Sequence, residues 1–342
     1  MKVIIPLAGK GTRLRPHTHV TPKPLVRVGG KPVMSYILDD LKKLGVMEIV
    51  FITGHLKEKI ETYIAEAYPE FTAHFVEQAV QDGTAGAVKL AEPFIDEDVL
   101  IIFVDTLFDA DLSLAQRLPP EYAGVIWAKE VEDYQRFGVI VTGDDGTMKR
   151  IVEKPKDPIS KLANIGLYYI RDYELLFRGI QDACEGPRGA GREYYLTDAF
   201  QFMIDHGAKI RVEPVAGWYD AGQVDTLLDT NRHLLEHGGR ARDPEGGRNV
   251  RIHRPVRVAE GVRLENVEIG PNVTVESGAV LRNTRISDSI VGEHATIEDA
   301  TLARSLVGDH AVVRNVSGSV NVGENSEVEG TRGTAWNGVE QR

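Results

Sequence analysis

The last third of the sequence carries a repeat that few folds can accommodate. Aliphatic residues recur there at steps of five or six residues, whereas an amphipathic helix needs steps of three and four. A glycine follows several of them, as in Ile269-Gly270, Val291-Gly292 and Val307-Gly308. A period near six with small residues beside the aliphatic ones is the hexapeptide signature of a parallel β-helix. The residues expected to point inward are Val258, Leu264, Ile269, Val275, Leu281, Ile286, Val291, Ile297, Leu302, Val307 and Val313.

The first two thirds of the chain alternate between short β-rich runs and helical stretches. Strands are predicted at Val3–Leu7, Glu48–Thr53, Ala73–Glu77 and Val99–Val104, and helices at Val33–Leu44, Leu56–Tyr68 and Thr84–Ala91. This alternation predicts an α/β domain with a Rossmann-like, doubly wound mixed sheet. Ligands bind beyond the carboxyl ends of the strands in such sheets, which places the loop from Ala8 to Pro24 at the expected site.

A stretch rich in glycine, proline and charge separates the two patterns and is typical of a linker. We therefore expect an α/β domain over residues 1–236, a linker over 237–250, a short left-handed parallel β-helix over 251–330 and a loose tail over 331–342. Because three hexapeptides make one triangular coil, the β-helix should have about four coils.

Composition narrows the possible partners. The chain has 40 Lys and Arg against 51 Asp and Glu, a net charge of −11 that is opposite to that of a typical nucleic-acid binder. The single cysteine, Cys184, excludes an internal disulfide and a cysteine zinc site. The apolar run Val99–Val104 is too short for a membrane span, and Lys10, Arg13 and Arg15 do not fit a secretory signal. We expect a cytoplasmic protein with small-molecule partners and with neither nucleic acid nor membrane as a partner.

The strongest local signal is the loop Leu7-Ala-Gly-Lys-Gly-Thr-Arg-Leu-Arg15. Gly9 and Gly11 allow backbone N–H groups to turn toward an anion, and Arg13 can neutralise charge on a phosphoryl group. The loop matches neither the P-loop nor the dinucleotide fingerprint. Taken alone, it is equally consistent with an ordinary glycine turn and a solvent-facing arginine.

The residues that follow favour the functional interpretation. Lys23 stands between two prolines, which fix the local backbone. Further motifs follow in order: Gln78 with Asp82-Gly83-Thr84, Asp105, Phe137-Gly138-Val139, Glu153-Lys154-Pro155, Asn164 with Gly166, Leu196-Thr197-Asp198 and Trp218-Tyr219-Asp220. Over most of the chain this series resembles the signature of the sugar-1-phosphate nucleotidyltransferases, also called nucleotide-sugar pyrophosphorylases. Several branches of that family carry a C-terminal β-helix.

The resemblance implies a reaction in which a sugar 1-phosphate attacks a nucleoside triphosphate, forming a nucleotide sugar and releasing pyrophosphate. It assigns Arg13 and Lys23 to catalysis, on the triphosphate and the departing pyrophosphate. It assigns the nucleotide to Leu7, Ala8, Gly9, Gly11, Thr12, Gln78, Gly83 and Thr84. It assigns the sugar phosphate to Gly138, Glu153, Lys154 and Asn164, and a Mg²⁺ cofactor to the carboxylates Asp105 and Asp220.

The nucleotide base is predicted from Gln78, which precedes Gly83 by five residues, the spacing of the base-reading pair in thymidylyl and uridylyl members. A glutamine amide can accept a hydrogen bond from N3–H of a pyrimidine and donate to a carbonyl. Gln81 competes for the same alignment, and Gly83–Ala87 also resembles guanylyltransferase members. We favour dTTP or UTP with glucose 1-phosphate, and the alternative is GTP with mannose 1-phosphate.

Two readings from other classes remain beside this one. A non-catalytic regulatory subunit would typically have lost one of the charged groups of the motifs, and all of them are present here. An acyltransferase could use His294 and His310 of the β-helix as bases. Their repetition is better explained by the repeating coil turn. We interpret the β-helix as an oligomerisation or regulatory platform and expect a homo-oligomer.

Overall fold

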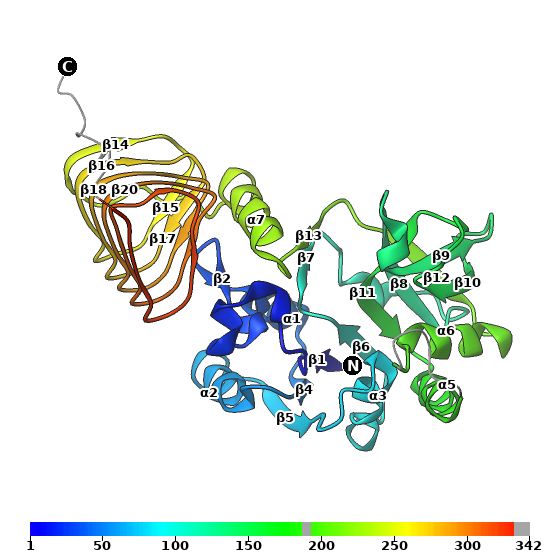
Figure 1. Ribbon diagram of the computed structural model, residues 1–342. Coiled ribbons are helices and arrows are strands. Elements are labelled where there is room, and N and C mark those ends of the chain that lie inside the picture. Colours follow the sequence, from blue (N-terminus) through cyan, green and yellow to red (C-terminus); the bar gives the residue numbers. More distant parts are fainter. Residues whose placement is uncertain (187–192, 332–342) are drawn as a thin grey trace. The chain divides into compact units, whose positions relative to one another are not determined.

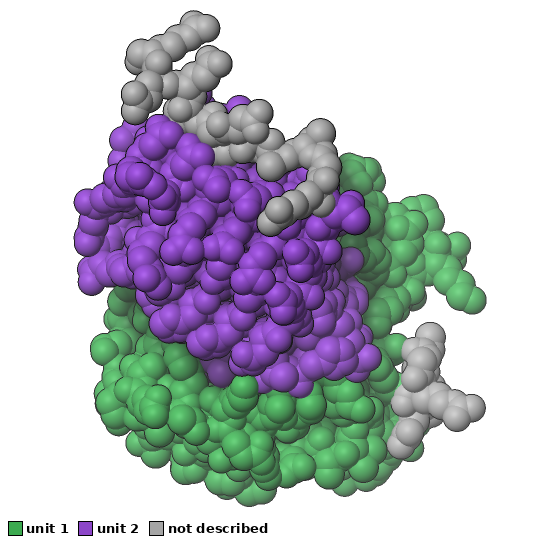
Figure 2. Space-filling model, turned by 60° about the vertical axis from the view of Figure 1, so that its left-hand side comes forward, with its two compact units in different colours: residues 1–10, 36–218 green, residues 11–35, 219–342 purple. Residues whose placement is uncertain are grey.

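The computed structural model describes residues 1–186 and 193–331 of the chain (Figure 1). The chain divides into two units, each built from two stretches of sequence. Unit 1 comprises residues 1–10 and 36–218, and unit 2 comprises residues 11–35 and 219–342 (Figure 2). The tail expected at 331–342 lies, from residue 332 onward, outside the described residues. The domain limits drawn from the sequence remain a prediction.

A mixed sheet forms the frame of unit 1. Its strands are β1 (Lys2–Pro6), β4 (Glu48–Thr53), β5 (Thr72–Glu77), β6 (Val99–Ile102), β8 (Gly124–Glu130), β9 (Gly138–Thr142), β10 (Met148–Glu153), β11 (Leu162–Ile170) and β12 (Ile210–Pro214). Among the described residues it has nine strands, in the order β10-β9-β11-β6-β1-β4-β5, with β8 paired to β11 and β12. β6, β1, β4 and β5 run parallel, and β11 runs antiparallel to β6. This confirms the Rossmann-like mixed sheet. A short strand, β7 (Thr106–Phe108), follows β6.

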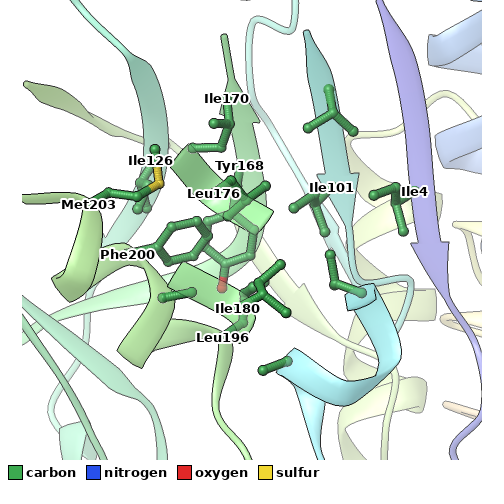
Figure 3. Close-up of a cluster of buried hydrophobic side chains, with 14 of the residues drawn as sticks. Ile4, Ile101, Ile126, Tyr168, Ile170, Leu176, Ile180, Leu196, Phe200 and Met203 are labelled. Atoms are coloured by element: carbon green, nitrogen blue, oxygen red, sulfur yellow. The ribbon is translucent and has the colours of Figure 1, made fainter. Parts of the chain in front are cut away.

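Helices follow several of these strands. They are α1 (Val33–Leu44), α2 (Lys57–Ala67), α3 (Thr84–Lys89), α4 (Leu114–Arg117), α5 (Tyr173–Glu185) and α6 (Leu196–Asp205). One face of the sheet packs against α3, α5 and α6 around a buried core. Figure 3 shows Phe200 of α6 beside Tyr168 of β11, and Met203 of α6 beside Ile126 of β8, in that core. The rings of Tyr168 and Phe200 lie 4.7 Å apart.

The limits of two elements match the prediction residue for residue, α1 at Val33–Leu44 and β4 at Glu48–Thr53. The other predicted elements of this part are also confirmed, with shifted ends. β6 stops at Ile102, two residues before the predicted end of the strand. Its pairing with β1 ends at Ile101, whereas the N–H of Phe103 still donates to the carbonyl of Gly166 at 2.8 Å and extends the contact with β11.

The first stretch of unit 2 has three short 3₁₀ helices, followed by the short strands β2 (Arg27–Val28) and β3 (Lys31–Pro32). Its second stretch continues after β13 (Trp218–Asp220) with the helix α7 (Val224–Glu236). The β-helix strands are β14 (Arg248–Ile252), β15 (Val256–Val258), β16 (Arg263–Ile269), β17 (Val273–Val275), β18 (Val280–Ser287), β19 (Ile290–Val291), β20 (Thr296–Ala303), β21 (Leu306–Val307), β22 (Val312–Arg314), β23 (Ser317–Gly318), β24 (Asn321–Val322) and β25 (Glu327–Glu329).

These strands stack in parallel sheets, as a β-helix requires. All the aliphatic residues predicted to point inward belong to its buried core. Within the described residues, one sheet has five strands, β15-β17-β19-β21-β24, so the coils outnumber the four or so that we expected. Val256 pairs with Val273 and Leu306 with Asn321, so a coil takes 15–17 residues. Three full hexapeptides would take about 18.

Membrane insertion through a helix finds no support in this fold. Across residues 1–186 and 193–331, every helix is either too short or too polar to cross a bilayer.

Candidate active site

The loop after β1, expected to bind a nucleotide, begins in unit 1. Leu7 and Ala8 are buried, and Leu7 donates its N–H to the carbonyl of Ile52 at 2.7 Å. The side chain of Gln81 donates to the carbonyl of Ala8 at 2.6 Å. Gly9 is exposed, and a Cβ built there would meet no atom within 4 Å. Contacts thus fix the two residues before Gly9, which itself faces open space.

The loop continues in unit 2, where Gly11 is closely packed. Its φ is +60°, and a Cβ there would lie 3.0 Å from both Thr18 Cγ2 and Lys23 Cβ. The Thr18 hydroxyl donates to the Gly11 carbonyl at 2.8 Å. Thr12 is exposed and opens the 3₁₀ helix Thr12–Leu14. Gly11 is therefore required by its left-handed backbone and its packing, whereas Gly9 has no such steric requirement.

Three charged groups that the sequence predicts for the site gather around Gly222 in unit 2. A Cβ built on Gly222 would lie 2.8 Å from Asp220 Oδ1, 3.1 Å from Lys23 Nζ and 3.4 Å from an Nη of Arg13. We call Arg13, Lys23, Asp220 and Gly222 the Gly222 cluster. Arg13 is exposed, so its guanidinium is accessible to a ligand. Two cations beside one carboxylate leave a net positive charge that suits a polyphosphate.

Asp220 is oriented by its own chain segment. Its Oδ1 accepts the N–H of Gly222 at 2.7 Å, and its Oδ2 accepts the hydroxyl of Thr226 at 3.2 Å. The hydroxyl of Thr230 donates to the Asp220 carbonyl at 3.0 Å. Both threonines lie in α7, so this helix fixes the carboxylate and the backbone of Asp220, the residue that meets Arg13 and Lys23.

Gln78, the predicted base-reading residue, directly follows β5 and is 8% exposed. Its amide nitrogen donates to Asp82 Oδ1 at 3.1 Å and to the Gly83 carbonyl at 3.2 Å. Its amide oxygen makes no hydrogen bond with residues 1–186 or 193–331 that would occupy it as an acceptor. The side chain of Gln81 is exposed and bonded to Ala8 instead. Gln78 is thus oriented with its oxygen as the available group.

Gly83 and Thr84 are packed against the chain before α6. Gly83 has φ +119°, and a Cβ there would clash with the backbone of Tyr194. The N–H of Ala85 donates to the Tyr194 carbonyl at 3.0 Å, and the Thr84 hydroxyl accepts the N–H of Leu196 at 2.9 Å. Within unit 1 these contacts join the start of α3 to the start of α6.

Residues predicted for the sugar phosphate meet on neighbouring strands of unit 1. Gly138 on β9 pairs with Glu153 on β10, and Asn164 on β11 donates to the Gly138 carbonyl at 3.1 Å. A Cβ on Gly138 would overlap the Asn164 amide and lie 2.8 Å from Thr197 and 2.9 Å from Glu153. Tyr168 donates its hydroxyl to Asn164 Oδ1. We call Gly138, Glu153, Lys154 and Asn164 the β9–β11 cluster.

The charged groups of the β9–β11 cluster are Glu153 and Lys154. Lys154 Nζ lies 3.6 Å from Glu153 Oε1 and 5.1 Å from the ring centroid of Tyr195. Burial raises the pKa of Glu153, and the positive charge of Lys154 partly offsets this increase. Burial also raises the pKa of the neighbouring Asp198. A half-buried carboxylate and an exposed ammonium can together receive a ligand that carries both hydroxyl groups and a phosphate.

The two carboxylates predicted for Mg²⁺ belong to different units, Asp105 to unit 1 and Asp220 to unit 2. Asp105 lies between β6 and β7, and its charge, with that of Glu153, adds to the burial that raises the pKa of Tyr168. In the described part of the chain, no three His, Cys, Asp or Glu side chains form a metal cluster. The donor chemistry nevertheless fits, because carboxylate oxygens suit Mg²⁺ and each Asp220 oxygen has a second lone pair beyond its hydrogen bond.

Several residues that shape these clusters were not given a role by sequence reasoning. Thr197 contacts Glu153, Tyr168 holds Asn164, and Gly222 and Thr226 shape the surroundings of Asp220. Thr197 lies inside a motif already noted and could have been found there. Gly222 and Thr226 become evident only when Arg13 and Lys23 are seen beside them.

Known proteins are similar to this chain in sequence and in fold. A family model described as "Nucleotidyl transferase" matches residues 2–237. "Bifunctional protein GlmU" of Methanocaldococcus jannaschii is 30% identical over 86% of this chain and 78% of its own length. A glucose-1-phosphate thymidylyltransferase of Streptomyces antibioticus is 31% identical over 87% and 83%, respectively. The fold is also similar, with a TM-score of 0.60 and 24% identity, to a solved UDP-glucose pyrophosphorylase complexed with UDP-glucose, over 69% of this chain and 98% of that one.

Proposed function

The chain belongs to the sugar-1-phosphate nucleotidyltransferase family, and from this premise we propose that it transfers a nucleotidyl group from dTTP or UTP to glucose 1-phosphate. The observation that carries the proposal is the convergence of Arg13, Lys23 and Asp220 around Gly222. A triphosphate needs cations of this kind, and two cations beside a single carboxylate leave a net positive charge to receive it.

In the proposed reaction, an oxygen of the sugar phosphate attacks the α-phosphorus of the triphosphate in line. The bond from that phosphorus to the oxygen of the β-phosphate breaks, and pyrophosphate leaves. No covalent intermediate with the protein is needed, so positioning and charge neutralisation carry the catalysis. Arg13 and Lys23 hold the negative charge that grows on the departing pyrophosphate. Gly9, Gly11 and Thr12 bring backbone N–H groups to the triphosphate.

The β9–β11 cluster takes the sugar 1-phosphate. Lys154 binds its phosphate, and the carboxylate of Glu153 accepts hydrogen bonds from sugar hydroxyl groups. Asn164, oriented by Tyr168, offers its amide to the sugar. The glycine at position 138 leaves room for that amide, because a side chain there would overlap Asn164. A carboxylate acceptor and an amide N–H donor at fixed positions distinguish hexoses by the direction of their hydroxyl groups.

Gln78 supports a pyrimidine with a protonated N3. Its amide nitrogen is engaged by Asp82 and Gly83, which leaves the amide oxygen to accept N3–H of thymine or uracil. Cytosine has no proton at N3 and would leave that oxygen unsatisfied. Thymine and uracil differ by a methyl group, which is worth only about 1–3 kcal/mol of discrimination.

A Mg²⁺ ion would be held by Asp105 and Asp220, whose oxygen donors suit it. When bound, it supplies charge neutralisation on the triphosphate oxygens. The protein's own contribution is to orient the carboxylates, and Asp220 is oriented by the hydrogen bonds it accepts from Gly222 and Thr226.

A pyrophosphate-release assay tests the proposal. It crosses dTTP, UTP, GTP, ATP and CTP with the 1-phosphates of glucose, mannose and N-acetylglucosamine, in the presence of Mg²⁺. We expect turnover with dTTP and UTP, highest with glucose 1-phosphate. Turnover confined to GTP with mannose 1-phosphate would keep the reaction and overturn the base assignment. No turnover by folded protein would favour a non-catalytic subunit.

The metal assignment has its own test. Asp105→Asn should abolish Mg²⁺-dependent turnover and leave the fold intact, because it removes one charge without changing the size of the side chain. The matched control is Asp109→Asn, an exposed carboxylate at the other end of β7, which should keep the wild-type rate. Near wild-type turnover in Asp105→Asn would show that this residue does not hold the metal.

A further inference from the structure

The segment that carries Arg13 and Lys23 groups with α7 and the β-helix rather than with the sheet of unit 1. Residues 11–35 hold little regular structure of their own: three short 3₁₀ helices, the pair β2–β3 and the first three residues of α1. Their placement within unit 2 must therefore come from side chains of other elements. These side chains are identifiable, and one of them lies at the centre of the attachment.

That side chain is Asn231 in α7, which is fully buried. Its Oδ1 accepts the N–H of Gly29, in the turn between β2 and β3, at 3.0 Å. The same oxygen accepts the hydroxyl of Thr274 at 2.7 Å, and its Nδ2 donates to the carbonyl of Asn272 at 3.2 Å. One amide thus joins the turn of segment 11–35, the helix α7 and the strand β17.

Two arginines also help to fix the position of this turn. Arg240 donates from Nε to the Gly29 carbonyl at 2.9 Å, and Arg257 donates to the Arg240 carbonyl at 3.1 Å. Gly30 has φ +85°, and a Cβ there would overlap the guanidinium of Arg257. Both polar backbone groups of Gly29 are therefore occupied by side chains from outside the segment, so the turn has one defined position.

A second attachment lies directly after Arg13. Asn321 of β24 donates to the Arg15 carbonyl at 3.2 Å and contacts His17 Nε2 at 2.7 Å. Arg27, which follows Lys23, pairs with Glu276 at 3.3 Å and with Glu293 at 2.8 Å. In sequence, one attachment thus follows Arg13, at Arg15 and His17, and the other follows Lys23, at Arg27 and Gly29. Both cations reach Asp220, which shortly precedes α7.

We propose that Asn231 is a positioning residue of the active site and that the β-helix is thereby part of the catalytic scaffold. The inference rests on the proposed function. Asn231 acts without touching substrate, by fixing the turn at Gly29 and through it the course of the segment that presents Arg13 and Lys23. A buried amide is suited to this task because its hydrogen bonds demand one orientation, whereas an apolar contact would permit sliding. The consequence is that a residue 208 positions after Lys23 sets its place.

The test uses the full-length Asn231→Ala variant. Because a displacement of about 1 Å at a catalytic group lowers rates by about 100-fold, we expect kcat to fall by about 10- to 100-fold. The KM for the sugar 1-phosphate should stay unchanged, since the β9–β11 cluster belongs to unit 1. A role in stability alone would lower Tm and leave kcat unchanged at temperatures well below Tm.

The matched control is Arg304→Ala. It removes the ion pairs that join the β-helix to Asp225 and Asp229 of α7, and Arg304 has no hydrogen bond or ion pair with the described residues of segment 11–35. Its kcat should equal that of the wild type. If Asn231→Ala does not fold, Asn321→Ala replaces it, because Asn321 is exposed and its removal leaves the core intact. We expect the same loss of kcat in a milder form.

Two measurements do not depend on turnover. Binding of inorganic pyrophosphate, followed by calorimetry, should weaken in Asn231→Ala and not in Arg304→Ala. Hydrogen exchange at the Gly29 amide should accelerate, since this N–H loses its acceptor. Faster exchange with unchanged pyrophosphate affinity and unchanged kcat would overturn the positioning role. A wild-type protein that turns over no substrate pair would refute the proposed function, and the pyrophosphate affinities would still decide the role of Asn231.

Discussion

The β9–β11 cluster of unit 1 is fastened by its immediate neighbours, whereas the Gly222 cluster of unit 2 is fastened from the far end of the chain. Glu153 and Gly138 face each other on paired strands, and Asn164 reaches Gly138 from the next strand. Arg13 and Lys23 lie instead on a segment whose anchors are Asn231 and Asn321. The two clusters therefore depend on different parts of the fold, although the proposed reaction needs both.

The difference has a physical cause. A sheet sets the spacing of facing side chains through its backbone ladder, so a cluster on adjacent strands is rigid without help. The core beneath adds to this, because the ring of Tyr168 packs on Phe200 and its hydroxyl holds Asn164. In segment 11–35 such a ladder is confined to the two-residue strands β2 and β3, and Arg13 and Lys23 lie outside it. The order of this segment depends on individual polar contacts, which a single substitution can remove.

The largest effect should come from removing a cation of the Gly222 cluster. Arg13→Ala should lower kcat by about 100- to 1,000-fold, the usual loss when one stabilising donor is removed from developing charge. The control is Lys10→Ala, an exposed cation three residues earlier. Equal kcat values for the two variants in the pyrophosphate-release assay would show that Arg13 is an ordinary surface charge.

A smaller loss should follow from crowding the same cluster without removing any charge. Gly222→Ala places a methyl group 2.8 Å from Asp220 Oδ1 and 3.1 Å from Lys23 Nζ, so these side-chain ends must move. We expect kcat to fall by about tenfold. Gly246→Ala is the control, because a Cβ there meets nothing within 4 Å. Wild-type kcat in Gly222→Ala would mean that the convergence at Gly222 is not used in catalysis.

The elements of the fold could be predicted because their signals are local. The bounds of α1 and β4 follow from periodicity within a dozen residues, and the inward residues of the β-helix follow from a repeat near six. The length of a coil could not be read so well. The backbones of neighbouring coils can pair when a coil has 15, 16 or 17 residues. Counting hexapeptides predicts a fixed coil length and misses this variation.

The attachment of segment 11–35 could not be predicted at all. Gly29 and Asn231 are 202 residues apart, and Arg15 and Asn321 are 306 apart. Single polar contacts over such separations leave no periodic trace in one sequence. The motifs did identify Arg13, Lys23 and Asp220, since each stands in a short recognisable stretch. Their meeting at Gly222 required the structure.

The β9–β11 cluster is best tested by pH. Burial raises the pKa of Glu153 above the ordinary 4.5 of a glutamate, so its carboxylate becomes protonated at a higher pH than an exposed one. Protonation removes the acceptor for sugar hydroxyl groups, and kcat/KM for the sugar 1-phosphate should fall as the pH drops through that pKa. Glu153→Gln should lower kcat/KM by about tenfold and abolish this acidic limb. An acidic limb that persists in Glu153→Gln would assign it to another group.

The smallest effect should be on stability, at the contact that fastens Arg27 to the β-helix. Glu276 is 4% exposed, and burial raises its pKa, which the charges of Arg27 and Arg257 partly offset. The folded state thus binds the proton of Glu276 more tightly than the unfolded state does. The stability this confers is complete below the unfolded pKa and is lost as the pH rises through the folded pKa.

Glu276→Gln stays neutral at every pH and keeps an acceptor for Arg27, so it should raise Tm at neutral pH by roughly 1–4 °C. The gain should vanish as the pH falls toward 4.5, the ordinary pKa of a glutamate. Glu293→Gln is the control, because Glu293 meets the same arginine but is 32% exposed. A lower Tm in Glu276→Gln at neutral pH would show that the charge of Glu276 stabilises this attachment. The Gly222 cluster would then depend on a buried charge in its attachment, in addition to lying far in sequence from the residues that hold it.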